Sequence, residues 1–246
     1  MKRFLPVLAL LLGVSAFAQN DSLSSGVYSV LTGKPAGSTT DLAMLKTHAS
    51  TLAPGKTNHP PRALNDVEEL ILVKEGMLKV TINDSDKVLG PGSIVMIMAG
   101  DKQSFQNTSD KPVTYYVLAF KSPSPVNMQR GKQAGGSLMI DWKDLTVKKT
   151  EKGESRPIFD RPTSMFARFE IHATTLNGGL ESHPPHTHRA EEAMLVMQGT
   201  TAGSINGKDY PAGVGEILLL RPDIPHNIKN TGTGQCWYYA MKWYNN

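Results

Sequence analysis

The chain has 246 residues, 39% of them hydrophobic and 20% charged, which is enough to build one large or two small folded domains and argues against a disordered chain. The formal net charge is +4, but without Lys2 and Arg3 the 26 basic residues become 24, against 22 acidic ones. This balance excludes the strongly basic surface of a nucleic-acid-binding protein, so we expect no nucleic-acid partner. The single cysteine, Cys236, excludes an intrachain disulfide, and we expect it to be buried in a strand.

The first 18 residues have the pattern of a secretory signal peptide. Lys2 and Arg3 precede an apolar run that ends in the small residues Ala16 and Ala18, which predicts cleavage before Gln19. The run is too short to span a bilayer comfortably, and no later segment approaches the roughly 20 apolar residues that a membrane helix needs. We therefore expect an exported protein, periplasmic or extracellular, with no membrane partner.

The rest of the chain consists of two related halves. LAMLKTHASTLAPGKTNHPP (42–61) aligns with FARFEIHATTLNGGLESHPP (166–185) at a constant offset of 124 residues. After one extra residue in the first copy the offset becomes 123, which pairs Glu69 with Glu192. A repeat of this length indicates two copies of one fold.

Each half has the composition of short strands joined by tight turns, with Asn206-Gly207 as a strong hairpin signal. We predict an all-β protein of two tandem barrels at 26–121 and 137–246. The Pro-, Gly- and Ser-rich residues 122–136 form the predicted linker. Helical periodicity is absent beyond the signal peptide, apart from a short turn around Trp142. The charged segment 148–161 is expected to be a solvated loop or the edge of the second barrel.

The segment Glu181 to Gly199, ESHPPHTHRAEEAMLVMQG, contains three candidate metal ligands. On an extended strand His186, His188 and Glu192 would share one face, while Glu191 would point away into solvent. A second segment, GEILLLRPDIPHNIKN, predicts a buried strand, a Pro-rich corner and then His226 as a fourth ligand.

These spacings resemble the two signatures of the cupin superfamily. The first is carried by His186, His188, Glu192 and Gly199, and the second by Gly215, His226 and Asn230. The resemblance implies double-stranded β-helix (jelly-roll) barrels, a bicupin whose second barrel holds one divalent ion of Fe, Mn, Ni, Cu or Zn, and allows a homodimer. The layout is also similar to ureidoglycine aminohydrolase, but that family has Glu-x-His, a later His and a Gln at the ligand positions, which argues against carrying its activity over.

The two halves can be compared position by position. The first has residues 62–65 where the second has His186 and His188, and Gln103 in place of His226, so only Glu69 remains of four ligands. We therefore expect a metal-free first barrel. The histidines present in both halves are expected to have structural roles: His48, His59, His172 and His183.

Three neutral imidazoles and one carboxylate would leave a divalent ion with a net charge near +1 and one or two open positions. Met194 and Val196 would line the pocket, and Arg168 would either pair with an anionic substrate or form a rim ion pair. Two hypotheses follow. One is a metal-dependent enzyme (dioxygenase, decarboxylase or isomerase type) acting on a small anionic or carbonyl-bearing substrate. The other is a non-catalytic module that binds a small carbohydrate or organic acid. The sequence identifies no general base or other catalytic residue.

Overall fold

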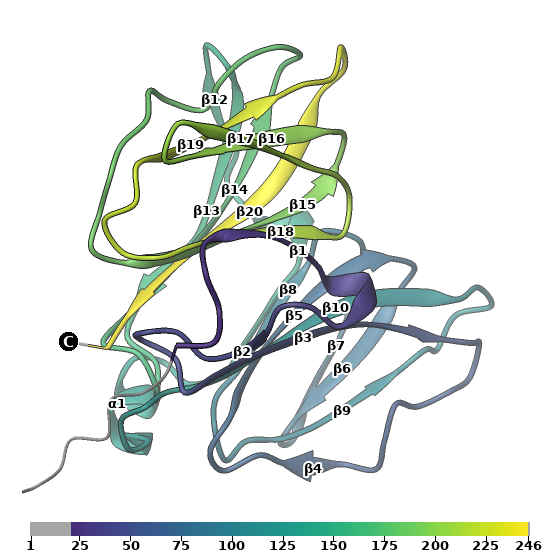
Figure 1. Ribbon diagram of the computed structural model, residues 1–246. Helices are drawn as coiled ribbons and strands as arrows, with labels where there is room; N and C mark the ends of the chain where they lie inside the picture. The colour runs from purple at the N-terminus through teal and green to yellow at the C-terminus, as the bar shows by residue number, and fades with distance from the viewer. Residues whose placement is uncertain (1–20, 246) are drawn as a thin grey trace, which may run out of the picture.

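The computed structural model describes residues 21–245, so the predicted signal peptide at 1–18 lies outside the described residues. The chain folds into two β-barrels, each made of a large and a small antiparallel sheet (Figure 1). This confirms the predicted all-β fold of two tandem barrels. Within the described residues, no helix combines the length and the apolar character that a membrane crossing requires.

The N-terminal barrel combines a six-stranded sheet of order β11-β8-β5-β10-β3-β2 with a four-stranded sheet of order β4-β9-β6-β7. Its strands are β2 (Ala36–Gly37), β3 (Met44–Leu52), β4 (Arg62–Ala63), β5 (Glu68–Glu75), β6 (Leu78–Ile82), β7 (Ser85–Leu89), β8 (Ile94–Ile97), β9 (Lys102–Gln106), β10 (Val113–Lys121) and β11 (Leu138–Ile140). Alternate side chains fill the barrel: Leu78, Val80 and Ile82 of β6 belong to its buried interior cluster.

The C-terminal barrel combines a seven-stranded sheet of order β1-β18-β15-β20-β14-β13-β12 with a three-stranded sheet of order β17-β16-β19. Its strands are β1 (Gly26–Ser29), β12 (Lys148–Thr150), β13 (Gly153–Arg161), β14 (Arg168–Leu176), β15 (Glu191–Gln198), β16 (Thr201–Ile205), β17 (Lys208–Ala212), β18 (Glu216–Leu220), β19 (His226–Asn230) and β20 (Cys236–Tyr244). The charged segment 148–161 forms the edge strand β12 and its neighbour β13. Asn206 and Gly207 make the β16–β17 turn with positive φ angles of 51° and 76°, as the hairpin signal predicted. Cys236 is fully buried, as expected.

The two barrels exchange their first strands. β1 precedes the N-terminal barrel in sequence but pairs with β18 of the C-terminal barrel, placing Val27 opposite Leu218. Conversely, β11 follows the linker but pairs with β8, placing Met139 opposite Val95. The expected ranges 26–121 and 137–246 follow the order of the chain, whereas the hydrogen-bonded sheets cross these limits at both ends (Figure 1).

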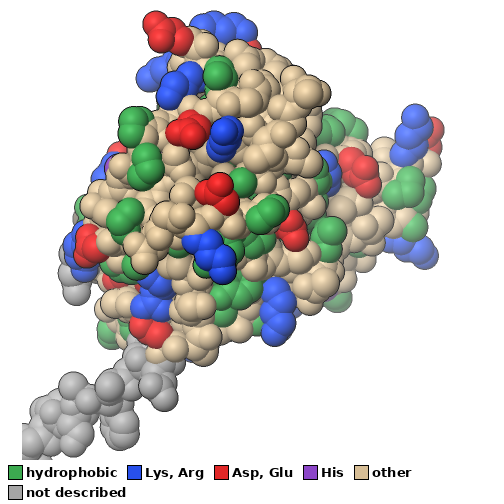
Figure 2. All heavy atoms as spheres, turned by 45° about the horizontal axis from the view of Figure 1, so that its top comes forward, with side chains coloured by type: hydrophobic (Ala, Val, Ile, Leu, Met, Phe, Trp, Pro, Cys, Tyr) green, Lys and Arg blue, Asp and Glu red, His purple; other side chains and the backbone are tan. Residues whose placement is uncertain are grey.

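The two large sheets pack against each other through an apolar core that joins the barrels. Its centre is aromatic: the ring of Phe120 lies edge-on to Phe166, Phe169 and Trp243, with centroids 5.5 to 5.8 Å apart. On the outer face shown in Figure 2, lysines and arginines are interspersed with carboxylates.

Two carboxyl groups are buried in this interface, one from each barrel. Glu68 accepts a hydrogen bond of 2.7 Å from the hydroxyl of Thr163, and Glu191 accepts one of 3.0 Å from the indole of Trp243. The hydroxyl of Thr39 also donates to Glu191, which mirrors the Glu68 to Thr163 contact. Each carboxyl thus reaches the segment that precedes a strand of the other barrel.

The prediction that Glu191 is solvated was wrong. Its side chain is fully buried, because the outward face of β15 is covered by the N-terminal barrel rather than by water. Burial raises the pKa of Glu191, and it raises the pKa of Glu68 to about 7.

The predicted linker contains the short helix α1 (Met128–Gln133). Asn127 caps it by accepting a hydrogen bond of 2.9 Å from the amide of Arg130, whose guanidinium donates to the carbonyl of Thr163. Two 3-10 turns, η1 (Val30–Thr32) and η2 (Trp142–Asp144), follow the exchanged strands. A helix of six residues is too short to show sequence periodicity, whereas η2 confirms the turn expected around Trp142.

Candidate metal centre

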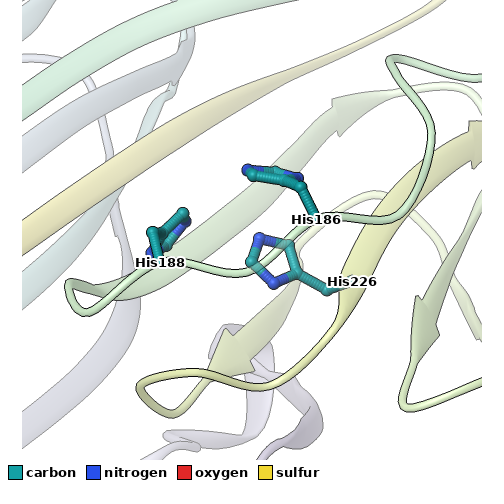
Figure 3. A group of neighbouring side chains, drawn as sticks. All are labelled: His186, His188 and His226. Carbon is teal, nitrogen blue, oxygen red and sulfur yellow. The ribbon is translucent and has the colours of Figure 1, made fainter.

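The candidate ligands are assembled from three neighbouring segments. His226 opens β19 and pairs with His186 through an isolated bridge, in which each backbone amide donates to the other carbonyl at 3.0 to 3.1 Å. His188 lies in the loop that leads to β15, and Glu192 is the second residue of that strand. Figure 3 shows the three imidazole rings turned toward one another.

The prediction that His186, His188 and Glu192 share one face of a single strand was wrong. β15 begins only at Glu191, and a bend at Arg189 and Ala190 separates it from the bridged His186. The convergence therefore comes from the fold of the loop between two sheets, not from the alternation of one strand.

The four side chains lie close enough to surround one point. One ring nitrogen from each of His186, His188 and His226 lies within 4.8 Å of the others. An oxygen of Glu192 lies 2.9 Å from Nε2 of His188 and 3.0 Å from Nε2 of His226. Glu192 and His226 are almost fully buried, so the site lies inside the barrel rather than on its surface.

Backbone carbonyls fix the orientation of two imidazoles. Nδ1 of His188 donates to the carbonyl of Ala190 at 2.9 Å, and Nδ1 of His226 donates to that of Ile224 at 2.7 Å. Because a carbonyl only accepts, Nδ1 carries the proton in each ring. In the neutral rings Nε2 therefore presents its lone pair to the centre, next to the carboxylate of Glu192, which is the arrangement of metal-binding histidines.

This donor set fits a divalent transition metal. Two Nε2 lone pairs directed at a carboxylate repel it unless a proton or a cation lies between them. Nδ1 of His186 is buried and has no hydrogen-bond partner among residues 21–245, which is costly for a polar atom. One cation among imidazole nitrogens and a carboxylate oxygen would remove the repulsion, and this mixture of ligands suits Fe, Mn, Ni, Cu and Zn alike.

The charges of the site favour the ligand forms of Glu192 and His186. Burial alone would raise the pKa of Glu192, but without a metal the hydrogen bonds from protons on Nε2 of His188 and His226, with the charge of Lys242, hold it below its ordinary value. Burial, together with the neighbouring imidazoles, lowers the pKa of His186. A metal ligand must be an ionised carboxylate or a neutral imidazole, so these two shifts act in the required direction, whereas the hydrogen bond to Glu192 raises the pKa of His188 and a metal must displace that proton.

Lys242 is a residue that the sequence analysis missed. In the sheet it lies opposite Glu192 of β15 and opposite Glu170 of β14, on strand β20. It is half-buried, and its charge lowers the pKa of both carboxyl groups without a direct ion pair to any of residues 21–245. A comparison of the two halves could have identified Lys242, because the matching residue of the first half is the uncharged Ala119, which lies opposite Glu69.

The pocket lining expected from strand parity was partly correct. Met194 and Val196 belong to the apolar interior cluster of the C-terminal barrel. Arg168, in contrast, is engaged by carboxylates: its guanidinium donates twice to Asp160 at 2.7 Å and once to Glu170 at 2.9 Å. With 44% of its side chain exposed, Arg168 forms the rim ion pair that was the alternative expectation.

Each of the two shared histidines of the C-terminal barrel contacts a neighbouring residue. The ring of His183 is perpendicular to that of His186 with centroids 4.2 Å apart, and its Nδ1 donates to the carbonyl of Pro184. Nδ1 of His172 lies 3.4 Å from Glu170. Both contacts are consistent with the structural role that was expected for these histidines.

The N-terminal barrel has the same scaffold with different side chains. Arg62 pairs with Gln103 across β4 and β9, as His186 pairs with His226. The amide of Gln103 donates to Glu69, the residue that corresponds to Glu192.

The structure also identifies the counterpart of His188. The carbonyl of Leu64 accepts from the amide of Gly100, as that of His188 accepts from Asp223. Arg62, Leu64 and Gln103 therefore stand where the other barrel has three imidazoles.

The cupin-domain sequence family matches this chain twice, at residues 49–119 and 173–241. The chain belongs to the cupin family. The two matches cover most of both barrels, and the second includes the four candidate ligands.

Curated proteins give only a local match to this cupin. The HTH-type transcriptional regulator PuuR of Escherichia coli is 37% identical over 49 residues, which is 20% of this chain and 26% of the regulator. The chain thus matches about a quarter of the length of that relative.

Solved structures match over most of the chain. A protein of Pseudomonas aeruginosa described as glyoxylate-induced has a TM-score of 0.70 at 17% identity, covering 89% of this chain and 80% of its own. Oxalate decarboxylase of Lactobacillus farciminis, solved as a formate complex, has a TM-score of 0.67 at 13% identity, covering 92% and 88%. At these identities the likeness shows the two-barrel fold.

Proposed function

We propose that this cupin is an exported metal-dependent enzyme that acts on a small anionic substrate in its C-terminal barrel. The observation that carries the proposal is the convergence of His186, His188, His226 and Glu192 on one point inside the barrel. The unpaired ammonium of Lys242 close to that point supports an anionic substrate.

The residues of the chain would act as follows. The three imidazoles and Glu192 hold a divalent ion, which when bound supplies a Lewis acid for a carboxylate or carbonyl oxygen. Lys242 attracts the substrate's negative charge and orients it toward the ligands. Met194 and Val196 form an apolar wall that keeps water away from that side and strengthens these electrostatic interactions.

The direct experiment measures metal content and turnover on the same preparation. The chain from Gln19 onward would be purified, analysed for metals and incubated with small carboxylates under air and under argon, while O₂ consumption and CO₂ release are recorded. Oxalate goes first in this screen because an oxalate decarboxylase shares the fold. CO₂ release without net O₂ consumption indicates a decarboxylase, and O₂ uptake indicates a dioxygenase.

His186→Ala is the matched control. If the activity belongs to the metal centre, this variant loses it while keeping the circular dichroism spectrum of the native protein. A compound that binds at the metal and is recovered unchanged under all conditions would contradict the enzyme and support the binding module instead.

Export is a separate part of the proposal and rests on residues 1–18. Mass spectrometry of the protein secreted or released from the periplasm of its own host should show Gln19 as the first residue. An intact N-terminus at Met1 in a cytoplasmic fraction would contradict export.

A further inference from the structure

The N-terminal barrel contains a cavity of about 200 Å³ at the position that corresponds to the metal centre. Arg62 and Glu69, the counterparts of His186 and Glu192, both line it. Although this barrel lacks the imidazoles, its interior is not filled with apolar side chains at this point. It holds a space lined largely by polar groups.

The charges in this cavity balance. Nη2 of Arg62 lies 4.0 Å from Oε1 of Glu69, whose other oxygen accepts from Gln103. Burial lowers the pKa of His48 in spite of the opposing charge of Glu69, and the charges of Lys46 and Arg62 lower it further, so that imidazole is neutral near pH 7. One guanidinium and one carboxylate remain, with no net charge between them.

Hydrogen-bonding capacity in the cavity is left unused. Nδ1 of His59 donates to the carbonyl of Pro60 at 2.8 Å, which leaves Nε2 as an acceptor. That nitrogen is buried and has no partner within residues 21–245. An orphaned acceptor near a carboxylate calls for a ligand that donates hydrogen bonds.

Donors and an aromatic wall complete the cavity. The hydroxyl of Tyr115 lies close to the side chains of Ser50 and Asn58, and the guanidinium of Arg62, with 51% of its side chain exposed, lines the same cavity. Phe105 lies edge-on to Tyr115 with centroids 5.5 Å apart, and both rings line the same space. A ligand must therefore both donate and accept hydrogen bonds and must also present some apolar surface.

We propose that the N-terminal barrel is a binding site for a small neutral polyhydroxyl compound, of the size of one sugar ring. Hydroxyl groups donate to Glu69 and His59 and accept from Arg62 and Tyr115, while the C–H face of the ring packs on Phe105. The cavity is smaller than the roughly 300–1,000 Å³ that drug-sized ligands occupy. An anion fits less well, because it would approach the carboxylate of Glu69.

The test uses isothermal titration calorimetry and saturation-transfer NMR on the metal-loaded chain. The probes are glucose, galactose, mannose, xylose and myo-inositol, with acetate and glycolate as anionic comparators. We expect at least one polyol to bind more tightly than either anion. Glu69→Gln should weaken that binding about ten- to a hundredfold, because it removes a charged acceptor.

The repeat supplies the matched control. Glu192→Gln makes the same change in the other barrel and should leave polyol binding unaltered. Arg62→Gln replaces a half-exposed residue, so it tests the site even if Glu69→Gln does not fold, and it should weaken binding at least fivefold.

Three results would overturn the proposal. They are no binding of any of the five polyols, tighter binding of acetate or glycolate than of every polyol, and polyol binding that survives both N-terminal variants but is lost in Glu192→Gln. The first two outcomes leave the metal-centre proposal untouched, whereas the third would move polyol binding to the C-terminal barrel; metal content and turnover of carboxylates test the metal centre separately.

Discussion

Each barrel begins a central strand with two consecutive glutamates, Glu68-Glu69 in one and Glu191-Glu192 in the other. The first of each pair turns outward and is buried between the barrels. The second turns inward and occupies the same place in each interior. The scaffold is thus shared down to the direction of these carboxyl groups.

The barrels differ in what surrounds the inner carboxylate. Glu192 faces two imidazoles, whereas Glu69 faces an amide and a guanidinium. The comparison teaches that the fold fixes one acidic group inside each barrel. The side chains at three neighbouring positions then distinguish the candidate metal centre of one barrel from the polar cavity of the other.

The largest expected effect is the loss of metal from one barrel only. His226→Ala removes a buried ligand and should lower bound metal from one per chain to less than about a tenth, as measured by elemental analysis. Gln103→Ala changes the matching residue of the other barrel and should leave one metal per chain. Two metals in the native protein would contradict the proposed difference between the barrels.

The reverse substitution should create a second centre. Arg62→His, Leu64→His and Gln103→His together place three imidazoles around Glu69, so metal content should rise from one to two per chain. Elemental analysis of the triple variant, alongside Gln103→His alone as the control, checks this. A triple variant that folds but still binds one metal would show that further residues of the C-terminal barrel are needed.

The next prediction concerns Lys242, a charged residue that only the C-terminal barrel has and that we propose attracts the substrate. Lys242→Met removes a charge that Ala119 never supplied in the other barrel, and it should lower kcat/KM for the anionic substrate about ten- to a hundredfold, mainly through KM. Steady-state kinetics with the best carboxylate from the screen gives the value. Lys46→Met, an exposed change on β3, is the control. Unchanged kinetics with one bound metal would remove Lys242 from the proposed site.

The buried interface carboxyl predicts a pH dependence of stability. The pKa of Glu68 is about 7 in the folded chain, compared with 4.5 for an ordinary glutamate. Below about pH 4.5 the group is protonated in both states. As pH rises toward 7 the unfolded chain ionises first, so folding loses about 3 kcal/mol of stability over this window and no more above it.

Glu68→Gln cannot ionise and should lack this contribution. Urea unfolding of both proteins at pH 4.5, 5.5, 7 and 8 should show the variant gaining stability relative to the native chain until pH 7. Parallel curves over the whole range would contradict a buried, pH-sensitive Glu68.

The smallest effect is expected at Arg168. Its ion pair with Asp160 is largely exposed, so Arg168→Met should change the free energy of unfolding by no more than about 1 kcal/mol and alter kcat/KM less than twofold. Urea unfolding and steady-state kinetics check both values. A tenfold loss of activity would return Arg168 to the substrate site in place of Lys242.

Much of the fold could be predicted because the repeat and the turn residues are local signals. The Asn206-Gly207 hairpin and the apolar strand before the Pro-rich corner appear where expected. The strand exchange could not be predicted, because pairing of β1 with β18 joins residues from Gly26 opposite Leu219 to Ser29 opposite Glu216, which are 187 to 193 positions apart. The prediction that Glu191 is solvated was wrong for a related reason. The alternation of side chains along a strand shows which face Glu191 is on, but it does not show whether water or another barrel covers that face.

The site was predictable in its composition and less so in its geometry. The spacing of these residues in the sequence predicted that His186, His188, Glu192 and His226 converge. In the structure their side chains lie around one point. The route differs, because the fold of a loop rather than one strand aligns the first two. Lys242 was missed because a lone lysine among aromatic residues of a last strand carries no motif, and only comparison with Ala119 makes it stand out.

The exchange of β1 and β11 means that neither half of the gene encodes a self-sufficient unit. A fragment covering residues 137–246 lacks β1, so the backbone hydrogen-bonding groups at the edge of β18 would be unpaired. An unpaired edge of this kind can pair with a strand of a second fragment. Attempts to isolate either barrel should start by carrying the exchanged strand along with it.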